Sequence, residues 1–471
     1  MRKTIITIML TILLLFPLYS FADSIRVGLK YGSSAAMSYT LSSDSGFYMG
    51  VYEDGQFVPT MPIAAYTNLN AVCENGSVNL FGDDGNIVQQ DFERYVIAAM
   101  DFDDGGVITA DGKEYRGGIM FSINSTGSIN MINVLEIDEY VYGVLNAEMH
   151  HDYPEEALKA QAVAARSFAV TNLNRHLQYG FDVCATTHCQ VYKGYADEYE
   201  ETNAAVDDTA GLCIYSGGKV VSAYYFKNSG GYTQNINDVW GSEADYLKAV
   251  KDEYSPEYQW TATFSFDDIE SKLESAGNSI GDIMRIEIVS RNESGAVDTL
   301  KFIGTGGEVS ISKEKIRTLF DASVIKSTHF SFTEYNTGSS DASQGTAETG
   351  AQKIAMSSVN AMGKDGARLS LSAKNSVSVI GADGEIEKRT LENIYAIDKS
   401  AALSAAGILP ASSDIGQSGG VEYVTKSPVT FTGLGYGHGI GMPQDSAIEM
   451  AKQGFTYDEI LHYYYTDIEI K

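Results

Sequence analysis

Basic residues are scarce in this chain. Its 471 residues include 33 Lys and Arg against 62 Asp and Glu, which gives a formal net charge of −29. Nucleic-acid phosphates require a basic surface, so a nucleic-acid partner is not expected. An electrostatic attachment to anionic lipid is not expected for the same reason. The excess of acidic groups mainly serves solubility.

Long apolar runs are also missing, with one exception at the N-terminus. Residues 5–18 are apolar apart from two threonines, Arg2 and Lys3 precede them, and Ser20-Phe21-Ala22 follows with the pattern of a cleavage site. Residues 1–22 are therefore predicted to be an export signal or an uncleaved membrane anchor, because the run is near the lower limit for spanning a bilayer. In both cases the body of the protein is expected to be extracytoplasmic, either secreted or held at the membrane.

Cysteines are few, and two common catalytic motifs are absent. Cys73, Cys184, Cys189 and Cys213 could pair in three ways outside the cytoplasm, but a chain of this length does not need disulfides to fold. No Gly-x-Ser-x-Gly elbow surrounds Ser229, which argues against a serine hydrolase. No glycine loop that would bind phosphate is followed by Lys-Ser or Lys-Thr.

The pattern along the chain predicts an α+β protein. Residues 24–130 alternate apolar and polar positions between Asp-Gly turns, which indicates a β-rich N-terminal region. Residues 135–178 are predicted to be helical, and residues 183–335 to mix strands, turns and short helices. Residues 336–420 are expected to be a Ser-, Thr- and Gly-rich linker followed by a small β-rich insert.

One carboxylate stands on an otherwise apolar helix face. In the predicted helix 138–149, Val141, Val144, Leu145 and Glu148 fall at i, i+3, i+4 and i+7. Burial favours the neutral form of a carboxyl group, so the pKa of Glu148 is expected to be raised. A neutral acid at neutral pH can serve as a general acid. The alternative is a structural glutamate that is satisfied by a helix terminus or an arginine.

A second helix is predicted to follow after a break at residues 150–153. Pro154 opens it, and Glu155 and Glu156 lie in its first turn, where the helix dipole favours acids. The helix is rich in alanine, which lets other elements pack closely around it. We therefore expect a helical pair that carries Glu148 and packs on mixed β-structure.

Cysteine and histidine gather in a short segment. Cys184, His188 and Cys189 lie within six residues, with His176 upstream, and these are the usual ligands of zinc. His188 and Cys189 can face one metal only if the backbone turns between them. A Cys184–Cys189 disulfide or free thiols are the alternatives, and a catalytic zinc site is a lesser one.

Glycine alternates strictly near the C-terminus, at every second position from Gly433 to Gly441. In an extended chain this spacing strips one face of side chains and places Tyr436 and His438 on the other. The bare face could let a ligand or another backbone pass closely, or it could reflect tight β packing.

Several segments together resemble the stage II sporulation protein D (SpoIID) / LytB family. The similarity is collinear over roughly residues 130–270 and 421–471, so residues 131–335 and 421–471 are expected to form the family's catalytic domain, with 336–420 as an addition. The segments that carry it are residues 139–149, 155–167, 186–194, Ser229-Gly230-Gly231-Tyr232-Thr233, Val239-Trp240-Gly241, 435–442 and 450–454. Two departures concern substrate detail: Lys227-Asn228 precedes Ser229, and Pro443 stands between Met442 and Gln444.

The resemblance implies a lytic transglycosylase that cleaves the MurNAc–GlcNAc bond of bacterial peptidoglycan and leaves 1,6-anhydro-MurNAc ends, in sporulation or cell-wall remodelling. Glu148 matches the family's catalytic glutamate, and His176, Cys184, His188 and Cys189 resemble a structural zinc cluster of some members. The residues expected to hold glycan are Arg166, Gln190, Ser229, Gly230, Gly231, His438 and Gln444. Arg166 would otherwise orient Glu148 or pair with another acid.

Three other functions remain open at this stage. The chain could be a non-catalytic peptidoglycan-binding protein that activates another wall hydrolase, and Glu148 would then be structural. It could be a zinc-dependent wall hydrolase. It could also be a structural component of a sporulation engulfment complex.

Overall fold

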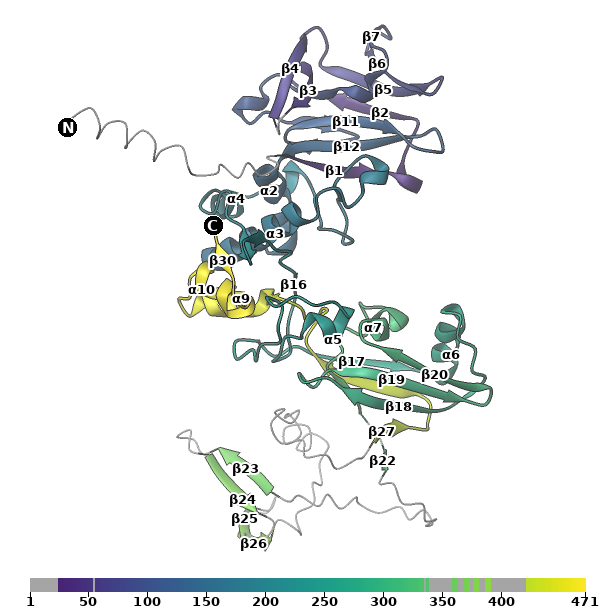
Figure 1. Ribbon diagram of the computed structural model, residues 1–471, viewed down its shortest axis with the longest axis vertical. Helices are drawn as coiled ribbons and strands as arrows, with labels where there is room; N and C mark the ends of the chain where they lie inside the picture. The colour runs from purple at the N-terminus through teal and green to yellow at the C-terminus, as the bar shows by residue number, and fades with distance from the viewer. Residues whose placement is uncertain are drawn as a thin grey trace, which may run out of the picture. The chain divides into compact units, whose positions relative to one another are not determined.

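The computed structural model describes residues 24–53, 56–333, 336–338, 358–362, 368–372, 376–380, 386–390 and 421–471. Several sheets and a group of helices confirm the α+β class (Figure 1). The export signal or anchor predicted for residues 1–22 lies outside the described residues, as does most of the predicted linker and insert. Among the residues described, no helix is long and apolar enough to cross a membrane.

The chain divides into two compact units, Met1–Tyr335 with Tyr423–Lys471, and Asn336–Glu422. In the second unit two antiparallel pairs join β23 to β24 and β25 to β26. The described strands of that unit are β22 (Asn336–Gly338), β23 (Ser358–Met362), β24 (Arg368–Ser372), β25 (Ser376–Ile380) and β26 (Ile386–Thr390). The remaining elements belong to the first unit, apart from β27 (Val421–Val424), which spans the boundary.

The N-terminal region of the first unit consists of two sheets that share a core (Figure 1). One sheet has the order β13-β1-β12-β11-β8-β3-β4 and the other β10-β9-β2-β5-β6-β7. The strands are β1 (Ser24–Lys30), β2 (Ser38–Ser42), β3 (Phe47–Glu53), β4 (Gln56–Ile63), β5 (Asn68–Glu74), β6 (Ser77–Gly82), β7 (Ile87–Gln89), β8 (Val96–Ala99), β9 (Ile108–Ala110), β10 (Lys113–Tyr115), β11 (Gly118–Ile123), β12 (Ile129–Glu136) and β13 (Val183–Cys184).

The predicted helical pair is confirmed, with shorter bounds than the sequence suggested. β12 continues to Glu136, α2 runs over Ile137–Glu148, and α3 runs over Glu155–Thr171 with Pro154 as its N-cap. Most side chains of α3 are buried, including all of those from Ala160 to Ala169, because alanine lets neighbours approach on several sides. Those neighbours are α2, α4 (Glu200–Asp207), α9 (Gln444–Lys452) and α10 (Tyr457–Tyr464).

A second β region with its own apolar core follows α4 and takes up the C-terminal strands. Its strand neighbours are β20-β19-β18-β27 in one sheet and β17-β28-β21 in another. The elements of this part of the chain are β14 (Ile214–Ser216), β15 (Lys219–Val220), β16 (Tyr225–Phe226), α5 (Ile236–Trp240), β17 (Gln259–Phe264), α6 (Phe266–Ser275), β18 (Ile283–Arg291), β19 (Val297–Gly304), β20 (Gly307–Ser312), α7 (Lys315–Phe320), β21 (Phe330–Phe332), β28 (Val429–Leu434), β29 (Met442–Pro443) and β30 (Glu469–Ile470).

Two short parallel pairings bring distant segments together. β13 pairs with β1, where Cys184 lies opposite Gly28, and this fixes the Cys/His segment to the N-terminal sheet. β16 pairs with β29, where Tyr225 lies opposite Met442. The second pairing places a segment from the middle of the chain beside a segment from its end.

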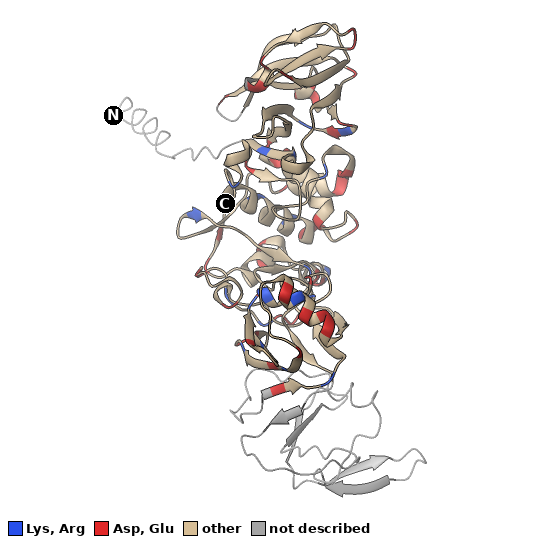
Figure 2. Ribbon diagram, turned by 90° about the vertical axis from the view of Figure 1, so that its right-hand side faces the viewer, with Lys and Arg blue, Asp and Glu red and all other residues tan. Residues whose placement is uncertain are grey.

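Among the described residues, Asp and Glu occur along the ribbon in both the β regions and the helices (Figure 2). Basic side chains are fewer and are scattered among them (Figure 2).

Candidate active site and metal centre

Glu148 is the last residue of α2, and its side chain is half-buried. Val141, Val144 and Leu145 on the same face are fully buried, as the helical spacing predicted. Burial raises the pKa of the Glu148 carboxyl group. Hydrogen bonds to its carboxyl group from the Val191 amide and from two side chains favour the charged form, and they offset only part of this effect.

Those two side chains are Tyr225 and Gln444, which the β16–β29 pairing brings to Glu148. The amide Nε2 of Gln444 also donates to the backbone carbonyl of Glu148 at 3.1 Å. The structure therefore places Gln444 against the acid, and the glycan contact expected for it stays a prediction. No sequence pattern pointed to Tyr225, because Glu148, its neighbour in space, lies 77 residues away, counted from 148 to 225.

A chain of hydrogen bonds fixes the direction in which Tyr225 donates. The Tyr140 hydroxyl donates to Oε1 of Gln190 at 3.1 Å, and Nε2 of Gln190 donates to the Tyr225 hydroxyl oxygen at 3.0 Å. The Tyr225 hydroxyl hydrogen is then free to point at Glu148. Gln190 is buried, and its Nε2 also donates to the Ala165 carbonyl. It therefore supports Tyr225, in place of the glycan contact expected from the sequence.

Arg166 lies elsewhere. Its guanidinium pairs with Asp138 at 2.5 Å and donates to the carbonyls of Leu212 and Val206 at 3.0 and 3.3 Å. It is almost completely buried. Of the roles considered for it, the structure shows the ion pair with an acid, and this pair ties α3 to α2.

The Ser229-Gly230-Gly231 motif is an internal joint rather than an open surface. The Ser229 hydroxyl is buried and donates to Asp252 at 2.6 Å, while it accepts from the Gly231 amide at 3.1 Å. A Cβ atom on Gly230 would lie 2.8 Å from the Leu434 carbonyl carbon. The Ser229 hydroxyl and Gly230 therefore serve internal packing, in place of the glycan contact expected for them. Nothing lies within 4 Å of a Cβ atom on Gly231, and the glycan contact expected there stays a prediction.

Asp252 was not singled out by its sequence, yet it organises this joint. Its buried carboxylate accepts from the hydroxyls of Ser229, Ser446 and Tyr464 at 2.6, 2.6 and 3.0 Å, and from the Tyr254 amide at 3.1 Å. Ser446 belongs to α9. Asp252 thus fixes the helix that begins with Gln444.

His438 is also engaged internally. Its Nδ1 accepts from the Ile440 amide at 3.0 Å, so Nε2 carries the hydrogen and donates to the Tyr225 carbonyl at 3.1 Å. Burial lowers its pKa to about 3, so the ring is neutral. Because both ring nitrogens are hydrogen-bonded to backbone groups, the ring holds β16 in place. This arrangement replaces the polar contact with glycan that was expected for His438.

The alternating glycines do not form an extended strand, so that expectation is wrong. Gly435, Gly437, Gly439 and Gly441 all have positive φ, between 77° and 129°. Gly433 alone lies in a strand, at the end of β28. The close approach of another backbone, which was one of the two alternatives, is what the structure shows: a Cβ atom on Gly441 would lie 2.0 Å from the Tyr224 carbonyl oxygen.

Gly441→Ala is expected to lower the free energy of unfolding by at least about 3 kcal/mol, because strain at positive φ adds to this overlap. Gly218→Ala is the matched control, since Gly218 has φ of 78° against 77° and nothing within 4 Å of the added Cβ. The control should cost only about 1–2 kcal/mol. Urea unfolding of both variants measures the difference, and equal losses would refute the close packing.

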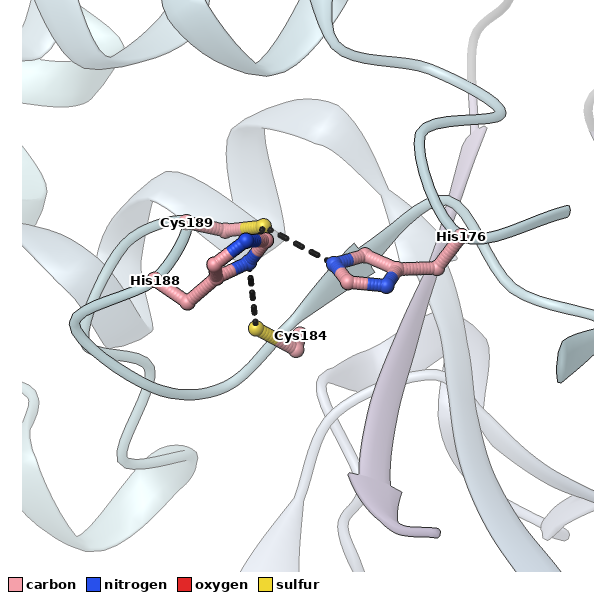
Figure 3. Close-up of side chains that lie close together, drawn as sticks. All are labelled: His176, Cys184, His188 and Cys189. Atoms are coloured by element: carbon pink, nitrogen blue, oxygen red, sulfur yellow. Dashed lines mark hydrogen bonds between the residues drawn. The ribbon is translucent and has the colours of Figure 1, made fainter. Parts of the chain in front are cut away.

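The Cys/His cluster converges as the sequence predicted (Figure 3). The ligand atoms of His176, Cys184, His188 and Cys189 all lie within 4.8 Å of one another. His176 Nε2 is 3.3 Å from the Cys189 sulfur, and His188 Nδ1 is 3.7 and 3.6 Å from the sulfurs of Cys184 and Cys189. The backbone turn that this arrangement requires is present, since the Cys189 amide donates to the Thr186 carbonyl.

The cluster leads directly into the acid site. Cys189 is followed by Gln190 and Val191, which contact Tyr225 and Glu148 respectively. All four cysteines are free, so the disulfide alternative is not seen. Hydrogen bonds from Cys189, Thr186 and His188 lower the pKa of the Cys184 thiol.

Two parts of the chain match known family models. The SpoIID family model, described as Stage II sporulation protein, matches residues 125–215, which include α2, α3 and the Cys/His cluster. A model described as Domain of unknown function (DUF8618) matches residues 234–351. The Stage II sporulation protein D of Bacillus amyloliquefaciens is 36% identical over 164 residues, which is 31% of this chain and 48% of that protein.

Residues 125–215 of the chain form a SpoIID domain.

The similarity extends beyond the matched domain. The Amidase enhancer of Bacillus subtilis (strain 168) is 30% identical over 405 residues, covering 84% of this chain and 50% of that relative. An uncharacterized protein of Brachyspira hyodysenteriae is 31% identical over 237 residues, 49% of this chain and 62% of that protein. The chain thus spans about half to three fifths of the length of these relatives.

Proposed function

We propose that this protein, with its SpoIID domain, acts outside the cytoplasm on the bacterial cell wall, as a lytic transglycosylase that cleaves peptidoglycan glycan strands between MurNAc and GlcNAc. The names of its relatives, an amidase enhancer and sporulation proteins, support a cell-wall role. The observation that carries the enzymatic part is the half-buried Glu148 carboxyl group, whose pKa burial raises.

In the proposed reaction, neutral Glu148 donates its proton to the oxygen that joins C1 of MurNAc to GlcNAc. The C1–O bond breaks, the GlcNAc hydroxyl leaves, and C1 gains oxocarbenium character. The C6 hydroxyl of the same MurNAc attacks C1 while the Glu148 carboxylate takes its proton. The product is a 1,6-anhydro ring, no water is consumed, and the acid is regenerated. One carboxyl group therefore serves both steps, unlike the paired carboxylates of most glycosidases.

The residues around Glu148 suit both halves of this cycle. Burial favours the neutral acid that the first step needs, and the donors Tyr225, Gln444 and the Val191 amide stabilise the carboxylate that acts in the second. Because the group is half-buried, part of it remains open to a substrate.

The Cys/His cluster is proposed to hold a structural zinc ion. In a tetrahedral site with Zn–N of about 2.05 Å and Zn–S of about 2.3 Å, a nitrogen and a sulfur lie about 3.6 Å apart. The three nitrogen–sulfur distances of 3.3, 3.7 and 3.6 Å fit this value. Zinc would crosslink the segments of His176, Cys184 and Cys189. The two thiolates and two imidazoles would fill all four positions around the ion and leave none open for substrate. The proposed role of the zinc is therefore structural: it holds Gln190 and Val191 next to Glu148.

Tyr225→Phe is expected to lower the cleavage rate roughly tenfold, because one hydrogen bond to a charged group is worth about 1.5–3 kcal/mol, part of which acts only in the charged state. Loss of this donor also raises the pKa of Glu148 further, so the fall in activity at alkaline pH should move to higher pH. Tyr192→Phe is the control, since the Tyr192 hydroxyl donates to Asn133 at 2.7 Å in the core. Rate–pH profiles of both variants make the comparison, and a shift with Tyr192→Phe alone would contradict the role of Tyr225.

A second candidate function is supported by the length over which one relative matches this chain. The Amidase enhancer matches 84% of this chain, so a non-catalytic protein that binds glycan strands and stimulates another wall hydrolase is the alternative. Assembly with other proteins of a sporulation complex would belong to the same alternative.

Digestion of purified peptidoglycan with mass analysis of the muropeptides separates these functions. The enzyme is expected to release anhydro-ended fragments by itself. Reducing ends would indicate a hydrolase and contradict the transglycosylase. If fragments appear only when an N-acetylmuramoyl-L-alanine amidase is added, and they are amidase products, the enhancer function replaces the enzymatic one.

A further inference from the structure

A second cluster of metal-binding side chains lies in the loop between α2 and α3, two residues after Glu148. One ligand atom each from His150, His151 and Asp152 lies within 4.8 Å of the others. Glu201, near the start of α4, joins them from outside the loop, since its carboxylate is 3.7 Å from His151 Nδ1. This group is separate from the Cys/His cluster and is not used by the proposed reaction.

We propose that His150, His151, Asp152 and Glu201 form a binding site for a divalent transition-metal ion such as Zn²⁺. Nitrogen and oxygen ligands at about 2.05 Å from a tetrahedral ion lie about 3.3 Å apart. His150 Nδ1 and His151 Nδ1 lie 3.2 and 3.3 Å from the two oxygens of Asp152. Small shifts of His150, His151 and Asp152 would bring one ion within reach of all three. Glu201, whose exposed carboxylate lies beside His151, would join them by rotating its side chain.

One buried polar atom in this loop lacks a hydrogen bond. His151 Nδ1 is shielded from solvent and has no hydrogen-bond partner, although the carboxylates of Asp152 and Glu201 face it at 3.3 and 3.7 Å. A buried polar atom without a partner is unfavourable, and a bound cation would satisfy it together with both acids.

The orientation of His151 is fixed by its surroundings. Its ring stacks on Tyr199 with a centroid distance of 4.0 Å and an interplanar angle of 8°. Its backbone amide donates to Oδ1 of Asn146 at 3.0 Å. The ring is therefore held with Nδ1 toward the carboxylates, as a preorganised ligand would be.

The charge around the cluster also favours a cation. Among the described residues, Asp152 and Glu201 form ion pairs with His150 and His151 and with no lysine or arginine. The donor set holds imidazole nitrogen and carboxylate oxygen without thiolate. Such a set suits Zn²⁺, Co²⁺, Ni²⁺ or Cu²⁺ better than Ca²⁺ or Mg²⁺, which prefer oxygen alone.

The test is equilibrium dialysis of the full chain against Zn²⁺ or Co²⁺, followed by elemental analysis. The variant is His150→Gln with Asp152→Asn, because both side chains are exposed, at 54% and 73%, and their replacement should leave the fold intact. We expect this variant to lose one metal ion per chain, or to show at least a tenfold higher Kd for it. His462→Ala is the matched control, since His462 lies 3.5 Å from Asp458 without a third donor in the same cluster, and it should lose none.

Co²⁺ absorption separates this site from the thiolate cluster. The double variant should keep sulfur-to-cobalt charge-transfer bands if the Cys/His cluster binds metal. Cys184→Ser combined with Cys189→Ser should lose those bands and keep the ion held by His150 and His151. Unchanged stoichiometry and Kd in the double variant, with unchanged thermal unfolding, would overturn the proposal and leave the cluster as a set of histidine–carboxylate contacts.

Discussion

Glu148→Gln is expected to lower the rate of glycan cleavage by about 10²- to 10⁴-fold, which is the usual contribution of a positioned general acid. Glutamine has nearly the shape of the neutral acid, but it cannot donate a proton to a leaving oxygen. The residual rate should no longer fall at alkaline pH, since in the wild type that fall reports ionisation of Glu148. Initial rates of anhydro-muropeptide release from pH 4 to pH 9 measure both effects.

Glu139→Gln is the matched control for this substitution. Glu139 is a half-buried glutamate of the same helix, its pKa is also raised by burial, and its carboxylate accepts from the Glu136 amide at the N-cap. It has no contact with Tyr225 or Gln444 and should keep nearly full activity. Equal losses in the two variants would show that the rate depends on the helix rather than on the acid.

The stability of Glu148→Gln provides a second check. A carboxyl group whose pKa is raised in the folded state contributes its stability below the unfolded-state pKa, and loses it as pH rises through the folded-state value. As pH rises from the unfolded-state pKa through the folded-state pKa of Glu148, wild type should therefore become less stable relative to Glu148→Gln. An inactive variant that is at least as stable as wild type at neutral pH excludes unfolding as the cause.

Removal of zinc from the Cys/His cluster is expected to have the second largest effect. An ion that binds only the folded state stabilises it by about 4 kcal/mol when its free concentration is a thousand times its Kd. Cys184→Ser, or a chelator on the wild type, should remove this stabilisation and release the segment that carries Gln190 and Val191. Cleavage should fall with it, although no bond-making step uses the metal.

Cys73→Ser is the control for this experiment. Cys73 is a half-buried free cysteine of the N-terminal region, and its thiol donates to the Gly127 carbonyl. Calorimetry with and without a chelator, together with metal analysis, makes the comparison. A chelator that leaves unfolding unchanged in wild type would contradict a structural zinc ion. Cleavage lost with full stability retained would point to a catalytic metal instead.

Helical periodicity and short sequence spacing predicted those parts of the site whose residues lie close together in the sequence. The spacing of Val141, Val144, Leu145 and Glu148 gave the face of α2 and the raised pKa, because one helix sets both. The Cys/His cluster followed in the same way, since His188 and Cys189 are adjacent and Cys184 precedes them closely.

The long-range partners could not be predicted in this way. Tyr225 reaches Glu148 only through the β16–β29 pairing, and Asp252 joins hydroxyls whose sequence positions differ by up to 235 residues, counted from 229 to 464. A sequence pattern shows which residues are polar, but it does not show which groups their polar atoms bind in the folded protein. Ser229, Gln190 and His438 were therefore expected to face glycan, whereas their polar atoms bind the protein itself.

The glycine segment shows a different limit. Alternation with period two is typical of a strand, but glycine also permits positive φ, and Gly435 to Gly441 use that freedom. Periodicity alone does not separate the two conformations. The close contact with Tyr224 and with the joint at Gly230 decides between them.

The ionisation of a single side chain tests the account most directly. Carbon-13 NMR of the protein labelled at glutamate carboxyl carbons, with Glu148→Gln to assign the resonance, gives the pKa of Glu148 in the folded state. The account predicts a value clearly above that of an ordinary glutamate, and a further rise in Tyr225→Phe. A Glu148 carboxyl group that titrates at or below the ordinary value would contradict a neutral general acid.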